Sequence, residues 1–453
     1  MENSRLFAPV RDQLSTGAFY ALVSGENLAN HGAPARAAWE IERLAALQGW
    51  SAGKSLGSEA ALRERLRVSR ETMREAIRIV EGRGAMRMRR GRSGGLILVR
   101  PTIERMAASF AAYMRALQIG EHAFHQSVRG LDQLLAWQIE RRSGPLPDPH
   151  AGETARHWLA RAGGRQTYLI YVKALEDLAP QIADVPAIPA ALAQSARRRN
   201  AADIRALLFE LPFTGRGPHA DAPDTVAAAQ ATTMAVAMIG RAEAAGSADL
   251  GNEASLCERF DTSRTIVRQG LRILQDLDLI EVRLGRGGGY TLKQPAPIGI
   301  IRQMFVWLAA RNCDPFSLDE LRCDLHAANF RLAAEVLAGM PAAERAARCE
   351  RLDAIIGGFS GPERFVQLRQ EVAAIAQSPM IDTFARSIVS YQARSYGDLP
   401  ELGSVRAFEV LERKVVACLR RCDLDGVERT LRQLLYYAGE RTLEGFGLRV
   451  AAE

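Results

Sequence analysis

The sequence predicts a mainly α-helical protein with two copies of one unit: a small helical domain with a two-stranded β-hairpin, followed by a helical bundle. Three observations lead to this fold class. A stretch of about forty residues occurs twice at constant spacing, each copy ends in a glycine-rich hairpin pattern, and the remaining sequence places apolar residues at helical spacing. We therefore expect two small domains, each with its own helical domain.

The composition predicts a soluble, basic protein. The chain has 453 residues, a formal net charge of +7 and a pI near 9.3. This charge is compatible with a nucleic-acid partner. The most apolar stretch, residues 226–240, is too short to span a bilayer, and the first twenty residues lack a secretory pattern. We expect a cytoplasmic protein without a membrane partner.

Neither the cysteines nor the histidines form a recognisable metal motif. The six cysteines contain no C-x-x-C pair, so neither a structural zinc site nor a redox motif is predicted. His122 and His125 are one helical turn apart and His157 follows later, but histidines at this spacing are common on helix surfaces. We expect no metal and no cofactor.

The internal repeat sets the domain boundaries. LGSEAALRERLRVSRETMREAIRI begins at Leu56 and LGNEASLCERFDTSRTIVRQGLRI at Leu250, an offset of 194 that continues without a gap to Gly95 and Gly289. The Gly-, Pro- and Asp-rich stretch TGRGPHADAPD between the copies is typical of a linker. The predicted domains are 20–100, 101–213, 225–295 and 298–446, with the linker at 214–224.

Each repeat opens with the pattern of a winged helix-turn-helix domain. In the first copy, Ser58 and Ser69 are predicted to cap two short helices, and the second helix (70–81) has one apolar and one basic face. A hairpin follows, with strands at 86–90 and 96–99. The second copy repeats this with caps at Asn252 and Ser263, a helix over 264–276 and strands at 280–284 and 290–293.

Both segments resemble the DNA-binding head of GntR-family regulators, which follows the approximate pattern L-P-S-E-x-x-L-A, S-R-x-x-V-R-E-A-L and G-x-G. Here these stretches are LGSEAAL, SRETMREAI and GRSGG, then LGNEASL, SRTIVRQGL and GRGGG. The resemblance covers about 75 residues per copy. It implies DNA contacts from the serine, the arginines of S-R-x-x-x-R and the wing: Ser69, Arg70, Thr72, Arg74, Arg92, Ser263, Arg264, Thr265, Arg268 and Arg286.

The two copies differ from the family pattern and from each other. Gly57 and Gly251 replace the usual proline, and Ala60 and Ala254 replace an arginine that often contacts DNA. Residues 56–96 carry eleven arginines against five glutamates, net +6, whereas residues 250–290 carry six arginines against six acidic residues, net zero. Because phosphate contacts dominate DNA affinity, we expect the first head to contribute more of the salt-dependent binding.

The sequences after each head are predicted to be all-helical bundles. The second resembles the FCD effector domain of the FadR-like branch through VAAIAQSPMI and ACLRRCDLDGVERTLRQLL. Many FCD domains bind a metal through histidines, but the corresponding positions here are Arg369, Glu412 and Leu434. The resemblance therefore implies an effector or oligomerisation domain without that metal set.

Together, the repeat and the resemblance predict a sequence-specific DNA-binding transcriptional regulator, expected to be a repressor. Its two heads would act as a pseudo-dimer on double-stranded DNA, with a small metabolite as effector. No G-x-S-x-G, H-E-x-x-H, P-loop or dinucleotide motif favours an enzyme. The alternative is a helical scaffold whose heads, one or both, no longer bind DNA. The sequence leaves open whether two chains pair.

Overall fold

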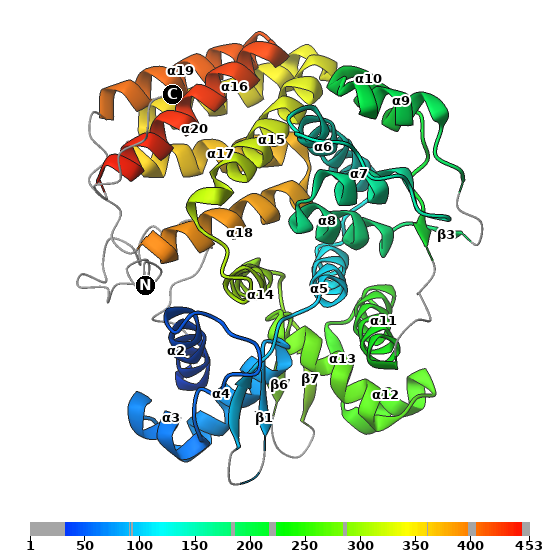
Figure 1. The fold of residues 1–453 in the computed structure, drawn as a ribbon, viewed down its shortest axis with the longest axis vertical. Coiled ribbons are helices and arrows are strands. Elements are labelled where there is room, and N and C mark those ends of the chain that lie inside the picture. The colour runs from blue at the N-terminus through cyan, green and yellow to red at the C-terminus, as the bar shows by residue number, and fades with distance from the viewer. Residues whose placement is uncertain are drawn as a thin grey trace.

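The computed structural model describes residues 32–89, 91, 94–182, 186–216, 223–283, 288–359, 361–396 and 405–445. These residues are mainly helical, with small sheets. Two hairpin-bearing heads occupy one end of the molecule and a larger body of helices occupies the other (Figure 1). Within the described residues, no helix combines the length and the apolar character that crossing a membrane requires.

The first head contains the two predicted helices and the hairpin, and a further helix, α2 (Ala33–Leu47), precedes them. The other elements are α3 (Glu59–Leu66), α4 (Arg70–Gly82), β1 (Met86–Arg89) and β2 (Gly95–Leu98). Ser58 and Ser69 cap α3 and α4, each accepting a hydrogen bond from a backbone N–H. Between the two helices Arg67 adopts a left-handed conformation, φ 52°, which turns the chain sharply. The strands pair antiparallel, Met86 opposite Leu98.

The second head has the same order of elements and one strand more. It contains α11 (Pro223–Ala244), β5 (Asp249–Gly251), α12 (Glu253–Phe260), α13 (Arg264–Asp276), β6 (Ile280–Arg283) and β7 (Gly289–Leu292). The sheet order is β5-β7-β6, so the predicted hairpin is part of a three-stranded sheet. In the first head, the corresponding pairing is a single bridge between Ser55 and Ile97.

The predicted linker, 214–224, contains regular structure at both ends. β4 (Gly215–Arg216) pairs in parallel with β3 (Gln181–Ile182), and α11 begins at Pro223. A two-residue strand is too short to show an alternation of apolar and polar residues, so the sequence pattern could not predict this pair. The glycine, proline and aspartate content predicted a linker here, and residues 217–222 of it lie outside the described residues.

Unusual backbone conformations recur with the offset of the sequence repeat. Several residues with positive φ form pairs that are 194 positions apart: Gly57 and Gly251, Arg67 and Asp261, Gly84 and Asp278, and Gln118 and Asn312. The last pair follows helices α5 (Ile103–Ala116) and α14 (Ile298–Ala309), which come after the two hairpins. The backbone similarity therefore extends beyond the hairpins, where the sequence match ends.

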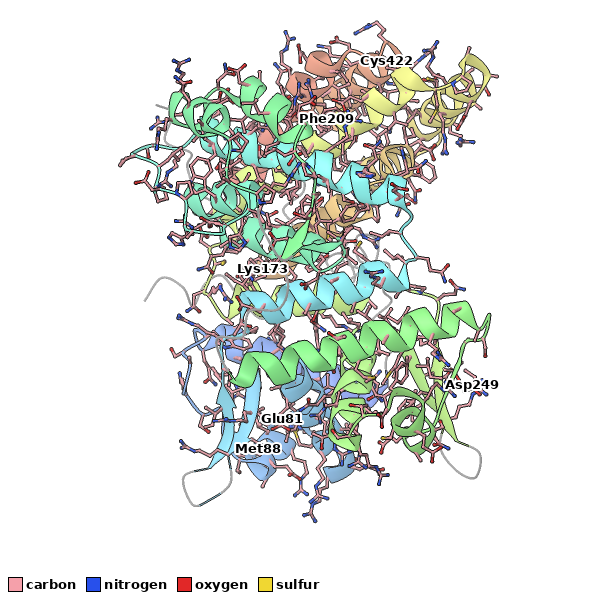
Figure 2. All side chains as sticks on the ribbon, turned by 90° about the vertical axis from the view of Figure 1, so that its right-hand side faces the viewer. Glu81, Met88, Lys173, Phe209, Asp249 and Cys422 are labelled. Atoms are coloured by element: carbon pink, nitrogen blue, oxygen red, sulfur yellow. The ribbon has the colours of Figure 1, made fainter. Side chains whose placement is uncertain are left out.

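The helix after each hairpin packs against the opposite head. α5 lies along α11 of the second head (Figure 2). α14 reaches the first head, where Phe305 contacts Trp39 of α2 with ring centroids 5.7 Å apart. Just after α14, Asn312 accepts a hydrogen bond from the backbone N–H of Trp50 at 2.9 Å and donates one to the carbonyl of Trp50 at 3.2 Å. These crossed contacts tie the two heads together.

The helical body is formed by elements from both halves of the chain. The first half contributes α6 (Glu121–Glu140), α7 (Ala155–Gly163), α8 (Gln166–Glu176), α9 (Ala190–Arg198) and α10 (Ala201–Phe209). The second contributes η2 (Phe316–Leu318), α15 (Asp319–Gly339), α16 (Ala342–Gly358), α17 (Gly361–Ala376), α18 (Pro379–Tyr396), α19 (Val405–Arg420) and α20 (Leu424–Gly445). α6 packs against both α15 and α18. Gly130 permits this close approach, because a Cβ there would overlap the side chain of Ile381.

Buried charges lie where the heads meet. α4 contacts α13, and near this contact the buried Arg83 pairs with the buried Glu42 of α2. Arg105 of α5 packs over Gly84, where a Cβ would come within 2.6 Å of its Nε. Asp276, at the end of α13, faces the charges of Arg83, Arg105, Arg272 and Glu42; burial raises its pKa to about 7 despite the three arginines.

This raised pKa predicts that the contribution of Asp276 to stability falls as the pH increases towards neutrality. The folded state binds the proton of Asp276 more tightly than the unfolded chain does, so its stabilisation is complete below pH ~4 and is lost as the pH rises through about 7. Asp276→Asn should therefore reduce the fall in thermal midpoint between pH 5 and pH 8, by the equivalent of about 2–3 kcal/mol. Asp278→Asn is the control, because Asp278 pairs with Lys293 at the surface. An identical pH profile for both variants would contradict the assignment.

Candidate nucleic-acid interface

The predicted DNA-contacting residues of each head gather at the start of one helix. Ser69, Arg70, Thr72 and Arg74 lie at the start of α4. Their counterparts at the start of α13 are Ser263, Arg264, Thr265 and Arg268. All of these side chains are exposed except Thr72, which is half-buried. Arg92 and Arg286, predicted at the hairpin tips, lie outside the described residues.

The two serines cap the helices that carry the arginines. The hydroxyl oxygen of Ser69 accepts a hydrogen bond from the backbone N–H of Thr72 at 3.1 Å, and its O–H donates to Thr72 Oγ1 at 2.9 Å. Ser263 accepts from the N–H of Ile266 at 3.4 Å. Ile266 stands where the first head has Thr72, so the second head lacks this hydroxyl. Thr265 corresponds to Glu71 and is not equivalent to Thr72.

One glutamate in each head contacts both predicted arginines. Glu253 Oε2 accepts hydrogen bonds from Nε of Arg264 and Nε of Arg268, both at 2.9 Å. In the first head, Glu59 Oε1 lies 3.8 Å from Arg70 Nε and 3.5 Å from Arg74 Nε. The arginines are four residues apart and therefore share one face of the helix.

The sequence analysis did not identify these glutamates as part of the site. Each is the first residue of the first helix in the helix–turn–helix, where a carboxylate also suits the positive end of the helix dipole. That local role explains the residue without any contact to the next helix. The signal that could have indicated the contact is the repetition of all three residues at the offset of 194.

The second head holds its arginines more firmly than the first. Partial burial alone would raise the pKa of Glu253, but hydrogen bonds from Arg264 and Arg268 outweigh this effect and lower the pKa below its usual value. Tyr290 of β7 also contacts this carboxylate, with its O–H donating to Oε1 at 3.5 Å. At the position of Tyr290 the first head has Leu96, which cannot form this hydrogen bond.

The basic surface is more extensive on the first head. Arg63, Arg65 and Arg67 are exposed along α3 and the turn that follows it. One turn beyond Arg74, the exposed Arg78 pairs with Glu75 at 2.7 Å. α3 and α12 lie at the same end of the molecule as the two hairpins (Figure 1). Exposed arginines at this end therefore form a candidate surface for a polyanion, with most of the charge on the first head.

In the helical body, buried ion pairs occupy two of the three positions that the sequence resemblance aligned with metal-binding histidines. Arg369 is buried and pairs with Asp382. Glu412 is buried and pairs with Arg364 at 3.1 Å. Leu434 is part of the core. In the part of the chain that the structure describes, no three His, Cys, Asp or Glu side chains lie close enough to share a metal ion.

Two cavities lie away from these buried pairs. One, of about 320 Å³, is in the second head between α11, β5 and α12, lined by residues such as Met238, Arg241 and Phe260. A smaller one, of about 50 Å³, is beside Arg156 and Glu176 in the first half of the helical body. Neither coincides with the arginine pairs of the heads.

Comparisons with known proteins give little further information. No protein-family model matches the chain, and no curated protein matches it. Among solved structures, the chain is similar to one described as Streptococcus agalactiae GntR, with 16% sequence identity and a TM-score of 0.32. The similarity covers 46% of this chain and 99% of that chain. A TM-score of this size does not establish a shared fold. The function is therefore inferred from the residues of the heads.

Proposed function

We propose that the chain is a sequence-specific DNA-binding transcriptional regulator of the GntR type, in which two winged helix-turn-helix heads act as a built-in pair. The observation that carries this proposal is the repeated arginine pair. In both heads, two exposed arginines one turn apart occupy the start of the second helix of a helix–turn–helix. A duplication of one ancestral head and its following helix accounts for the common offset.

The chemistry of these positions suits DNA. The second helix of a helix–turn–helix enters the major groove with its N-terminal residues at the base edges. An arginine guanidinium there can donate two hydrogen bonds to O6 and N7 of guanine. The remaining arginines of the first head and the hairpin can contact phosphates, which position the protein without reading sequence.

The paired heads predict the symmetry of the operator. Helices α5 and α14 fix each head against the other, so both heads can engage DNA as one body. The two recognition helices differ, with Glu71-Thr72-Met73 in one and Thr265-Ile266-Val267 in the other. We therefore propose an operator with two unequal half-sites. We also propose that a small metabolite bound by the helical body changes the arrangement of the heads, giving a repressor that responds to an effector.

A second candidate is a regulator or scaffold in which only the first head binds DNA. The zero net charge of residues 250–290 and the contacts between Glu253 and both arginines favour it. Under this candidate the second head would serve mainly to hold the first one in place.

Selection of DNA by the full-length protein tests the proposal. Duplexes would be recovered from a random pool and their affinity compared with a scrambled duplex by fluorescence anisotropy in a salt series. We expect enrichment of a two-part motif and a preference of about a thousandfold or more at physiological salt. Failure to enrich any motif in two independent selections would contradict sequence-specific DNA binding.

A further inference from the structure

The contact between Glu253 and its two arginines has a geometry that leaves the outer parts of both guanidinium groups exposed. Glu253 is bound by Nε, the inner nitrogen, of Arg264 and of Arg268. The arginine side chains are 67% and 59% exposed, whereas that of Glu253 is 20% exposed. Because the carboxylate is contacted through Nε and both arginine side chains are largely exposed, their terminal amino groups remain available to a ligand.

We propose that Glu253 is a positioning residue that determines the sequence specificity of the second head. It holds Arg264 and Arg268 with their terminal amino groups directed outward for guanine, and it weakens the attraction of this head for phosphate at any sequence. This inference rests on the proposed DNA-binding function and assigns different roles to the two heads, affinity to the first and discrimination to the second.

Two physical effects support this role, and both favour specific over non-specific binding. A guanidinium that is already held in place loses less side-chain freedom when it forms a bidentate contact with a base. A carboxylate within the interface cancels positive charge and repels phosphates, which lowers sequence-independent affinity. Tyr290 strengthens the first effect, because its hydrogen bond ties Glu253 to β7 as well as to α13.

The first head provides the contrast. Glu59 lies 3.5 and 3.8 Å from the corresponding arginine nitrogens, and a leucine occupies the place of Tyr290. Its arginine pair is therefore held less tightly, and its surroundings carry a net charge of +6. The first head is expected to supply affinity and the second to supply discrimination.

The test uses the full-length protein with an operator duplex recovered by selection and a scrambled duplex of equal length. Glu253→Gln should bind scrambled DNA about fivefold more tightly, with a salt dependence steeper by about one charge. Its preference for the operator should fall by about tenfold. Glu258→Gln is the matched control, because Glu258 is exposed on the same helix and the change in charge is the same. It should leave the preference unchanged, and Glu59→Gln should lower it less than Glu253→Gln does.

The outcomes separate this inference from the proposed function. If wild type discriminates and Glu253→Gln keeps the same preference, the positioning role is overturned while DNA recognition stands. If wild type shows no preference for any selected DNA, both are overturned. Should Glu253→Gln fail to melt cooperatively, Glu253→Asp replaces it. This variant keeps the charge but shortens the side chain, so it should lose preference without a change in the salt slope, and an unchanged preference would again overturn the role.

Discussion

Arg74→Ala should weaken binding to the operator by roughly five- to a hundredfold, the range expected for the loss of one bidentate base contact. Arg74 lies at the start of α4, and its side chain is 55% exposed and 3.5 Å from Glu59. Its removal takes away both a base contact and one positive charge from the more basic head. Anisotropy titrations on operator and scrambled duplexes separate the two losses, because only the base contact affects the preference.

Arg78→Ala is the control for this prediction. Arg78 is one turn further along α4, is 63% exposed and pairs with Glu75 at 2.7 Å, so the change in charge is identical. We expect it to weaken binding to both duplexes similarly. Equal losses of preference in Arg74→Ala and Arg78→Ala would mean that α4 contributes only charge. Arg268→Ala in the second head should reduce preference more than Arg74→Ala does, with a smaller effect on scrambled DNA, because the second head is proposed to supply most of the discrimination.

The second large effect is expected at the junction of the heads, where Arg83→Leu should destabilise the protein by about 3–5 kcal/mol. Arg83 and Glu42 form a buried ion pair near the contact between α4 and α13. Removing the arginine leaves a buried carboxylate without this partner, which is far more costly than losing a surface pair. The thermal midpoint, read by circular dichroism, should fall markedly.

The double variant Glu42→Leu/Arg83→Leu tests the cause. Replacing both members of a buried pair by apolar residues is often nearly neutral, so the double variant should recover most of the lost stability. If it is as unstable as Arg83→Leu alone, lost packing rather than an uncompensated charge explains the effect. Arg43→Leu, which disrupts the surface pair of Arg43 with Glu40, should change the midpoint little.

Local features of the heads could be read from the sequence because each depends on neighbouring residues. Ser58 and Ser69 are the predicted caps, and the predicted apolar face of α4 is buried, with Met73, Ala76 and Val80 in the core. These features follow from side-chain hydrogen bonding and from the helical period. The order of helix, turn, helix and hairpin was predicted for the same reason.

Features that depend on distant residues could not be predicted in this way. The contact of Trp39 with Phe305, the bonds of Asn312 to Trp50 and the pairing of β3 with β4 each join segments without a local pattern. Glu253 was missed because its position at a helix start already had a sufficient local explanation. The repeat does extend to local backbone conformation, because residues with positive φ recur at its offset as far as Gln118 and Asn312.

A hydroxyl-radical footprint of the full-length protein on its selected operator shows whether the two heads of one chain read DNA together. We expect two protected patches about one helical turn apart, roughly 10 base pairs centre to centre. Arg74→Ala should weaken mainly one patch and Arg268→Ala mainly the other. A single patch that Arg74→Ala abolishes and Arg268→Ala leaves intact would contradict joint reading by the two heads and leave DNA binding to the first head alone.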